Sequence, residues 1–233
     1  MDGSGDKHCS VLWCHNGTKL EKLKEIVIPN SMGWVYAAFT EYLGFEAYDG
    51  EYKVMGLAAY GRYRSDISSK MDQIVHWIEQ TNEYQVDPTY IHYGPRTYSD
   101  RYTDYLVELF GKPPRLPVDP ITSWHEDIAY GVQAKLEEIA TRLVSWGIRE
   151  TGYQNVCSGG GVGLNVKMNT QIFRMPKVKD IFAQPICSDS GGSVGAALAA
   201  CFNETGIEPE PLKTLALGHE DSLDDIRRVF DLA

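Results

Sequence analysis

The alternation of hydrophobic and polar positions predicts that the chain opens with a β-hairpin and continues into a helix. Residues 7–28, KHCSVLWCHNGTKLEKLKEIVI, place strand-forming residues on both sides of an Asn-Gly pair, which favours the type I′ turn of a tight hairpin. Apolar residues then recur at helical spacing over residues 31–43, with Ser31 as the N-cap and Gly44 as the stop. We therefore expect an initial sheet and a helix that faces the core.

The second half of the chain carries a pattern typical of α/β proteins. A capping box at Ser123 and Glu126 begins a long apolar stripe, which ends near Gly152. Strand, helix, strand and helix follow at residues 154–158, 162–174, 180–186 and 192–203. This order implies parallel strands with crossover helices. Between the two halves we expect helices and loop excursions, with helices at 68–80 and 99–110 and excursions at 82–98 and 111–122.

Each of the two expected parallel strands ends in a glycine-rich stretch. The candidate binding glycines are Gly159, Gly160 and Gly161 after the first strand, and Gly191 and Gly192 after the second. Glycines there let the backbone approach a ligand, and the next helix offers free N–H groups at the edge where such sheets bind ligands. The pair predicts a nucleotide site that is neither a P-loop nor a GxGxxG fingerprint. Tight packing between strand and helix is the competing interpretation.

Carboxylates and a lysine accompany these glycines. Asp189 directly precedes the second glycine pair, and Asp2 begins a glycine-rich turn in MDGSGD. A carboxylate beside a bound phosphate predicts a divalent cation between them, whereas the alternatives are that Asp189 caps a helix and that Asp2 lies in a frayed terminus. Lys53 and Gly56 in EYKVMGLAAYG are further candidates for holding an anion, although an ordinary helix with a glycine stop has the same pattern.

Composition narrows the class of function. The chain has 22 Lys and Arg against 32 Asp and Glu, a net charge of −10, and it has no basic cluster, which argues against nucleic-acid and membrane partners. No apolar run approaches the ~20 residues of a membrane span, and the first residues lack a signal-peptide pattern. The five cysteines include no CxxC pair and are typical of reduced thiols. We therefore expect a cytoplasmic protein.

These motifs, in this order, resemble the O-carbamoyltransferase family of nodulation and antibiotic-tailoring enzymes. The similar segments are DGSGD (2–6), PNSMGWVYAAFTEYLGF (29–45), EYKVMGLAAYG (51–61), SGGGVGLN (158–165) and DSGGSVGAAL (189–198). The resemblance implies part of an actin/Hsp70/sugar-kinase-like (ASKHA) domain, with a mixed sheet and crossover helices. It places a carbamoyl-transfer domain, incomplete at its N-terminus, over residues 1–205. A linker and the start of a truncated C-terminal domain would follow over 206–233.

The resemblance also implies a reaction. ATP and carbamoyl phosphate would give carbamoyl-adenylate, from which the carbamoyl group passes to a hydroxyl of a small-molecule or natural-product substrate. Gly160, Gly161 and Asn165 would contact the adenosine part. Asp2 and Asp189 would be ligands of Fe or Zn, with Mg accompanying the nucleotide. The family adds two histidines four residues apart, a spacing that the six histidines here do not show, so we expect the chain to be inactive without the missing domains of its parent.

Two other functions stay open at this point. An ATP-dependent kinase on the same fold would need a phosphoryl-accepting site, and dependence on carbamoyl phosphate separates it from a carbamoyltransferase. A non-catalytic nucleotide-binding fragment would bind ATP without turnover. The sequence identifies neither the general base nor the acceptor alcohol, and we expect the excursions between residues 82 and 122 to select the acceptor because such loops commonly carry specificity.

Overall fold

The computed structural model describes most of the chain in two compact units. The described residues are 1–17, 19–93, 100–207, 210, 212, 214–215, 218 and 221–231. By their contacts the two units are Met1–Gly192 and Ser193–Ala233. Residues 94–99, which belong to the expected excursion and to the start of the helix expected at 99–110, lie outside the described residues, as does part of the expected linker after residue 206. The domain boundary expected after residue 205 stays a prediction.

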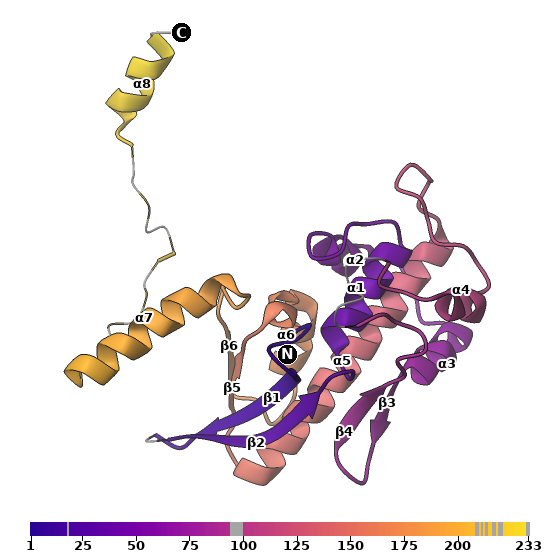
Figure 1. Cartoon of the computed structure of the whole chain (residues 1–233), viewed down its shortest axis with the longest axis horizontal. Helices are drawn as coiled ribbons and strands as arrows, with labels where there is room; N and C mark the ends of the chain where they lie inside the picture. Colours follow the sequence, from indigo (N-terminus) through magenta and orange to yellow (C-terminus); the bar gives the residue numbers. More distant parts are fainter. Residues whose placement is uncertain are drawn as a thin grey trace. The chain divides into compact units, whose positions relative to one another are not determined.

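The described chain is a mixture of helices and short strands, as the sequence pattern predicts (Figure 1). In order, the elements of the first unit are β1 (His8–His15), β2 (Leu20–Val27), α1 (Met32–Tyr42), α2 (Glu51–Leu57), α3 (Ser65–Ile74), β3 (Val75–Ile78), β4 (Glu83–Val86), α4 (Asp104–Phe110), α5 (Ser123–Thr151), β5 (Asn155–Ser158), the 3-10 turn η2 (Gly161–Leu164), α6 (Val166–Phe173) and β6 (Asp180–Ala183). Helix α7 (Ser190–Thr205) begins in this unit and continues into the second, which also contains α8 (Leu223–Asp231).

The described strands form three two-stranded sheets. β1 and β2 are the predicted antiparallel hairpin, and its turn residue Gly17 has a φ of +90°. β3 and β4 form a second antiparallel pair, whereas β5 and β6 are parallel and are connected through α6, which confirms the predicted crossover. Because each described strand has a hydrogen-bonded neighbour on one side alone, the pairs do not join into the continuous mixed sheet that the resemblance implies.

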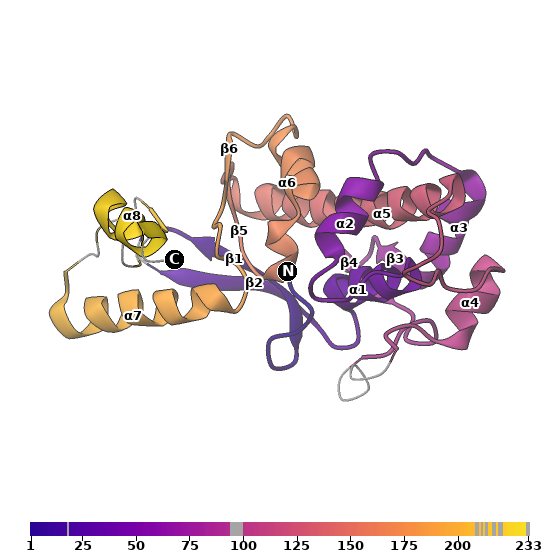
Figure 2. The ribbon, with the colours of Figure 1, turned by 90° about the horizontal axis from the view of Figure 1, so that it is seen from above.

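Helix α5 is the centre of the core of the first unit. Its predicted apolar stripe is buried, at Ile128, Val132, Leu136, Ile139 and Leu143. Helices α1, α2, α3 and α6 pack against it, and α1 and α2 lie alongside it in Figure 2. Each buried side chain of this kind stabilises the fold by about 1.5–3 kcal/mol, so α5 fixes the positions of the elements around it. None of the described helices combines the length and the apolar content that crossing a bilayer requires.

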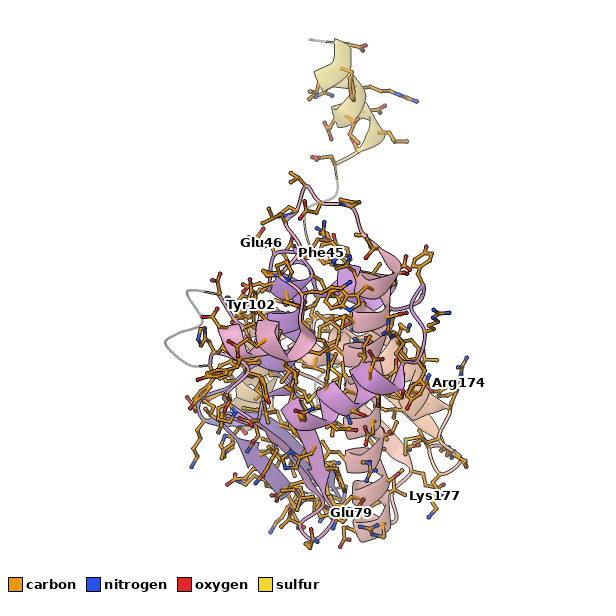
Figure 3. All side chains as sticks on the ribbon, turned by 90° about the vertical axis from the view of Figure 1, so that its right-hand side faces the viewer. Phe45, Glu46, Glu79, Tyr102, Arg174 and Lys177 are labelled. Atoms are coloured by element: carbon orange, nitrogen blue, oxygen red, sulfur yellow. The ribbon has the colours of Figure 1, made fainter. Side chains whose placement is uncertain are left out.

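An aromatic cluster extends the core beyond α5. The ring of Phe39 packs edge-on against that of Phe110 at 5.6 Å, and Tyr42 packs edge-on against Tyr102 at 5.7 Å. Figure 3 labels Tyr102 close to Phe45, at the opposite end of this unit from Glu79. Edge-to-face contacts of this kind add about 0.5–1.5 kcal/mol each beyond the burial of their surface. The C-terminal half of α1 is thereby joined to α4 and to the segment that leads into it.

The prediction of a helix over residues 68–80 is wrong for its second half. Helix α3 ends at Ile74, and residues 75–78, Val-His-Trp-Ile, form strand β3 paired with β4. β-Branched and aromatic residues favour a strand, and Val75 is buried where the chain turns from one element to the other. The helix expected at 99–110 is α4, which begins at Asp104 because Thr103 before it has an extended backbone.

The predicted capping box of α5 lies one residue earlier than expected and uses different side chains. Thr122, not Ser123, is the N-cap, because its backbone is extended (φ −119°, ψ 166°). Its backbone N–H donates to His125 Nδ1 at 3.0 Å, and its hydroxyl donates to the same nitrogen at 2.9 Å. His125 therefore takes the place expected for Glu126. Burial is the main cause that lowers the pKa of His125, which favours the neutral ring that accepts these bonds.

Candidate functional site

The turn at the N-terminus is tied to β1 and to the start of α1. The Asp2 N–H donates to Cys9 O at 2.9 Å, and the Gly3 N–H donates to the Asp2 side chain at 2.7 Å. Ser31 is the N-cap of α1, as predicted: its Oγ accepts the Trp34 N–H at 3.1 Å and donates to Gly3 O at 2.6 Å. The structure therefore holds Asp2 in a defined turn, in contrast to the alternative of a frayed terminus.

The first glycine loop lies directly against this turn. The Met1 amino group donates to Gly159 O at 2.9 Å. A Cβ on Gly160 would lie 2.1 Å from Met1 O and 3.2 Å from one Asp2 carboxylate oxygen, and a Cβ on Gly161 would lie 3.2 Å from the other. The N-terminus lies close to α6 in both ribbon views (Figure 1, Figure 2). The structure thus brings Asp2 to Gly160 and Gly161, which the sequence predicts only as separate motifs.

The turn between β6 and α7 reaches the same place. A Cβ on Gly163 would lie 3.1 Å from Cys187 Sγ, so the loop after β5 contacts the loop after β6. Burial raises the pKa of the Cys187 thiol, and the Asp2 charge raises it further. A Cβ on Gly191 would lie only 2.0 Å from Ile186 O. Gly191 therefore lets the chain turn tightly into α7, a packing role that the structure gives it independently of any ligand.

Asp189 and Gly192 lie at the surface where α7 begins. Asp189 is exposed, and its backbone oxygen accepts the Gly192 N–H at 3.0 Å, while a Cβ on Gly192 would meet open space. Among the described residues, no group of three or more His, Cys, Asp or Glu side chains is arranged to hold a metal ion. No described hydrogen bond or close contact joins Asp189 to Asp2, so a metal ion held by these two carboxylates stays a prediction.

Asn165 has a structural role that the sequence motif does not reveal. Its Oδ1 accepts the Met168 N–H at 2.9 Å and so caps α6. Its amide also exchanges two hydrogen bonds with Gln133, a residue that is only 2% exposed on α5. The sequence interpretation missed Gln133, and the signal that identifies it is a glutamine next to the apolar stripe of α5. Contact of Asn165 with adenosine stays a prediction.

Lys53 and Gly56 lie on the surface of α2. The Lys53 ammonium is 5.6 Å from the centre of the exposed Tyr52 ring, and a Cβ on Gly56 would meet open space. No described hydrogen bond or ion pair joins either residue to the glycine loops. The start of α2 is nevertheless close to Tyr36, because the Glu51 charge is one of the causes, after burial, that raise the Tyr36 pKa. A ligand contact by Lys53 or Gly56 stays a prediction.

Comparison with known proteins agrees with these motifs. The model of the carbamoyltransferase N-terminus matches residues 1–198. The chain is 36% identical over 199 residues to an uncharacterized protein of Synechocystis sp., covering 85% of this chain and 32% of that protein. It is 32% identical over 206 residues to the nodulation protein NolNO of Sinorhizobium fredii, covering 88% of this chain and 28% of that protein. It is 30% identical over 253 residues to the nodulation protein NolO of Bradyrhizobium diazoefficiens, covering 100% of this chain and 42% of that protein.

The match includes every motif that the structure brings together: the N-terminal turn, the loop after β5 and the turn before α7. The chain spans between 28% and 42% of the length of these relatives. Its similarity therefore concerns one part of longer proteins. The chain belongs to the carbamoyltransferase family, through the N-terminal domain of that family.

Proposed function

We propose that the chain forms the part of an O-carbamoyltransferase that binds an adenylate and transfers its carbamoyl group to the hydroxyl of a small molecule. Family membership supports carbamoyl transfer as the reaction class. The observation that carries the proposal is the meeting of Asp2 with Gly160 and Gly161 directly after β5. ATP and carbamoyl phosphate give the carbamoyl-adenylate, with the other domains of the longer parent as partners. An ASKHA-type arrangement of the complete domain belongs to the same proposal.

The chemistry of a carbamoyl-adenylate suits this arrangement. The compound is a mixed anhydride, so transfer breaks the bond between the carbamoyl carbon and a phosphate oxygen of AMP. A bond from that carbon to the acceptor oxygen forms, the hydroxyl proton is lost, and AMP leaves. Backbone N–H groups of a glycine loop stabilise the charge that develops on the leaving phosphate. A divalent cation held by Asp2 and Asp189 would reduce the repulsion between these carboxylates and the phosphate.

Calorimetric titration with ATP, in EDTA and with Mg²⁺, tests the assignment of the site. The wild-type chain should bind ATP about tenfold more tightly with Mg²⁺, which corresponds to about 1.4 kcal/mol. Asp2→Asn should lose this dependence on Mg²⁺ and should bind ATP in EDTA at least as tightly as the wild type, because a negative charge beside the phosphate is removed. Gly161→Val should lose ATP binding, since its side chain enters the space beside the Asp2 carboxylate.

Asp6→Asn is the matched control. It removes one negative charge from the same N-terminal turn, but Asp6 is exposed, and asparagine tolerates its φ of +53°. This variant should keep both the ATP affinity and the response to Mg²⁺. Unchanged ATP affinity in folded Gly161→Val, or an equal response to Mg²⁺ in Asp2→Asn and the wild type, would show that the site is placed wrongly.

Synthetic carbamoyl-adenylate tests the chemistry separately, because it bypasses the step that consumes ATP. We expect the chain alone to bind this compound without forming a carbamate ester when alcohols and Fe²⁺ or Zn²⁺ are added. Two carboxylates supply only part of the ligand set that these metals take in proteins. Mass spectrometry detects the ester. Robust turnover by the chain alone would contradict the proposed need for imidazole ligands.

A further inference from the structure

A set of buried hydrogen bonds connects α1, α5 and the start of α6. Gln133 on α5 is only 2% exposed and is the centre of this set. The Tyr36 hydroxyl on α1 donates to Gln133 Oε1 at 2.8 Å, and Gln133 Nε2 donates to Glu137 Oε1 at 2.8 Å. Asn165, which joins η2 to α6, is the remaining partner. Three elements that surround the first glycine loop therefore meet at one amide.

The hydrogen bonds allow one orientation of the two amides. Asn165 Nδ2 donates to Gln133 Oε1 at 2.8 Å, and Gln133 Nε2 donates to Asn165 Oδ1 at 3.0 Å. The Met168 N–H donates to Asn165 Oδ1, so this atom must be the oxygen. Gln133 must then turn its NH₂ group toward Asn165 Oδ1. Its Oε1 is left to accept from both Tyr36 and Asn165, as observed.

This arrangement uses the hydrogen-bonding groups of both amides. Gln133 uses both N–H groups and accepts two bonds, and Asn165 Oδ1 also accepts two bonds. Asn165 Nδ2 gives one N–H to Gln133, and the Asn165 side chain also hydrogen-bonds the Tyr36 phenol, a contact that lowers the pKa of Tyr36 while burial, the larger cause, raises it. The backbone of Asn165 is fixed as well, because its N–H donates to Val162 O at 3.0 Å and closes η2, while the Gly163 N–H donates to Gly160 O at 2.8 Å.

We infer that Gln133 is a positioning residue for the glycine loop. It touches no ligand itself, but it holds the Asn165 side chain, and with it the turn at 160–165 beside the proposed nucleotide, in one conformation. The inference rests on the proposed adenylate site and adds a residue to it. Without the amide of Gln133, Asn165 loses one partner of its Nδ2 and one of the two donors to its Oδ1, so its side chain is held less firmly.

Gln133→Glu is the sharpest variant, because it keeps the shape and replaces the NH₂ group by oxygen. An ionised carboxyl there faces Asn165 Oδ1 and Glu137 Oε1, both acceptors, and can donate to neither. ATP affinity should fall at least tenfold at pH 8. The charges of Glu137 on α5 and Glu51 on α2 favour protonation of the introduced carboxyl, as does its burial, whereas the hydrogen bonds donated by the Tyr36 hydroxyl on α1 and by Asn165 Nδ2 oppose it. Affinity should partly recover at pH 5.5, where the protonated group donates one hydrogen bond.

Two controls separate positioning from general support of the fold. Gln73→Glu makes the same chemical change at an exposed residue of α3, whose described side-chain hydrogen bond is a 3.4 Å contact with Ser69 O of its own helix. Tyr84→Phe removes a buried hydroxyl that bonds Ser10 Oγ at 2.7 Å and does not bond Gln133 or Asn165. Both variants should bind ATP within twofold of the wild type at pH 8 and at pH 5.5, even if Tyr84→Phe melts at a lower temperature.

Hydrogen exchange without ligand gives a second, independent measurement. Gln133→Leu should raise the exchange rates of amides in residues 160–168 at least tenfold, and Tyr84→Phe should leave these rates unchanged. If the wild type binds no ATP, the proposed function fails, and the exchange rates alone decide the role of Gln133. The inference is overturned if the exchange of this loop is the same in Gln133→Leu and the wild type. It is also overturned if ATP binds the wild type and Gln133→Glu equally at both pH values.

Discussion

Gly160→Ala perturbs the close approach between the loop after β5 and the N-terminal turn. Gly160 has φ +83° and ψ 162°, a region that is essentially restricted to glycine and that costs other residues about 1–3 kcal/mol. The added Cβ would also lie 2.1 Å from Met1 O, and overpacking of this kind costs about 1–3 kcal/mol. The lower freedom of alanine in the unfolded chain offsets about 0.4–1 kcal/mol. We therefore expect the free energy of unfolding to fall by about 1–6 kcal/mol.

Urea denaturation of Gly160→Ala and Gly159→Ala measures this difference. Gly159 is the matched control, because it is the preceding residue in the same loop, is exposed and leaves open space where a Cβ would lie. Its substitution should change the free energy of unfolding by less than about 0.5 kcal/mol. Equal midpoints and equal slopes for the two variants would refute the reasoning, since they would show that neither the backbone conformation nor the contact with Met1 O constrains Gly160.

Two further predictions concern buried ionisable groups. Burial raises the pKa of the Cys9 thiol to about 11 from its ordinary 9.0, so its contribution to stability is complete below pH 9 and is lost as the pH rises toward 11. Between these pH values the free energy of unfolding should fall by up to about 1.4 kcal/mol per pH unit. Urea denaturation at several pH values should show a smaller fall per pH unit for Cys9→Ala than for the wild type. Lys135→Met should cost less than about 1 kcal/mol, because the side chains of its partners Asp72 and Glu138 are 59% and 38% exposed and stay hydrated, and thermal denaturation checks this. A loss above about 3 kcal/mol would mean that these ion pairs behave as buried ones.

The features that could be predicted from the sequence are those that a few neighbouring residues decide. The Asn-Gly hairpin, the Ser31 cap and the stop at Gly44, whose φ is +76°, all depend on local backbone preference. The parallel pairing of β5 with β6 follows from alternating strands and helices of ordinary length. The helix expected over residues 75–78 was wrong, because the β-branched and aromatic residues of this segment favour a strand and pair with β4.

The site could be predicted only as separate motifs. Asp2 and Gly160 are 158 residues apart, and their contact depends on the packing of the N-terminal turn against the loop after β5, which spacing along the chain does not encode. Gln133 belongs to none of the sequence motifs, because its role depends on partners on α1 and at the start of α6. For Asn165 the motif identified an important residue, but the structure assigns its described contacts to the cap of α6 and to Gln133.

The contact between Gly163 and Cys187 has a consequence for chemical reactivity. A raised pKa leaves little thiolate at neutral pH, so Cys187 should react with an alkylating reagent more slowly than the exposed Cys157. A reagent attached to the Cys187 sulfur adds bulk where even a Cβ on Gly163 would lie 3.1 Å from that sulfur. Because Cys187 is half-buried, its sulfur accommodates a reagent more readily when the loop after β5 moves away from the loop after β6. The labelling rate of this natural thiol therefore responds to that motion, without any engineered probe.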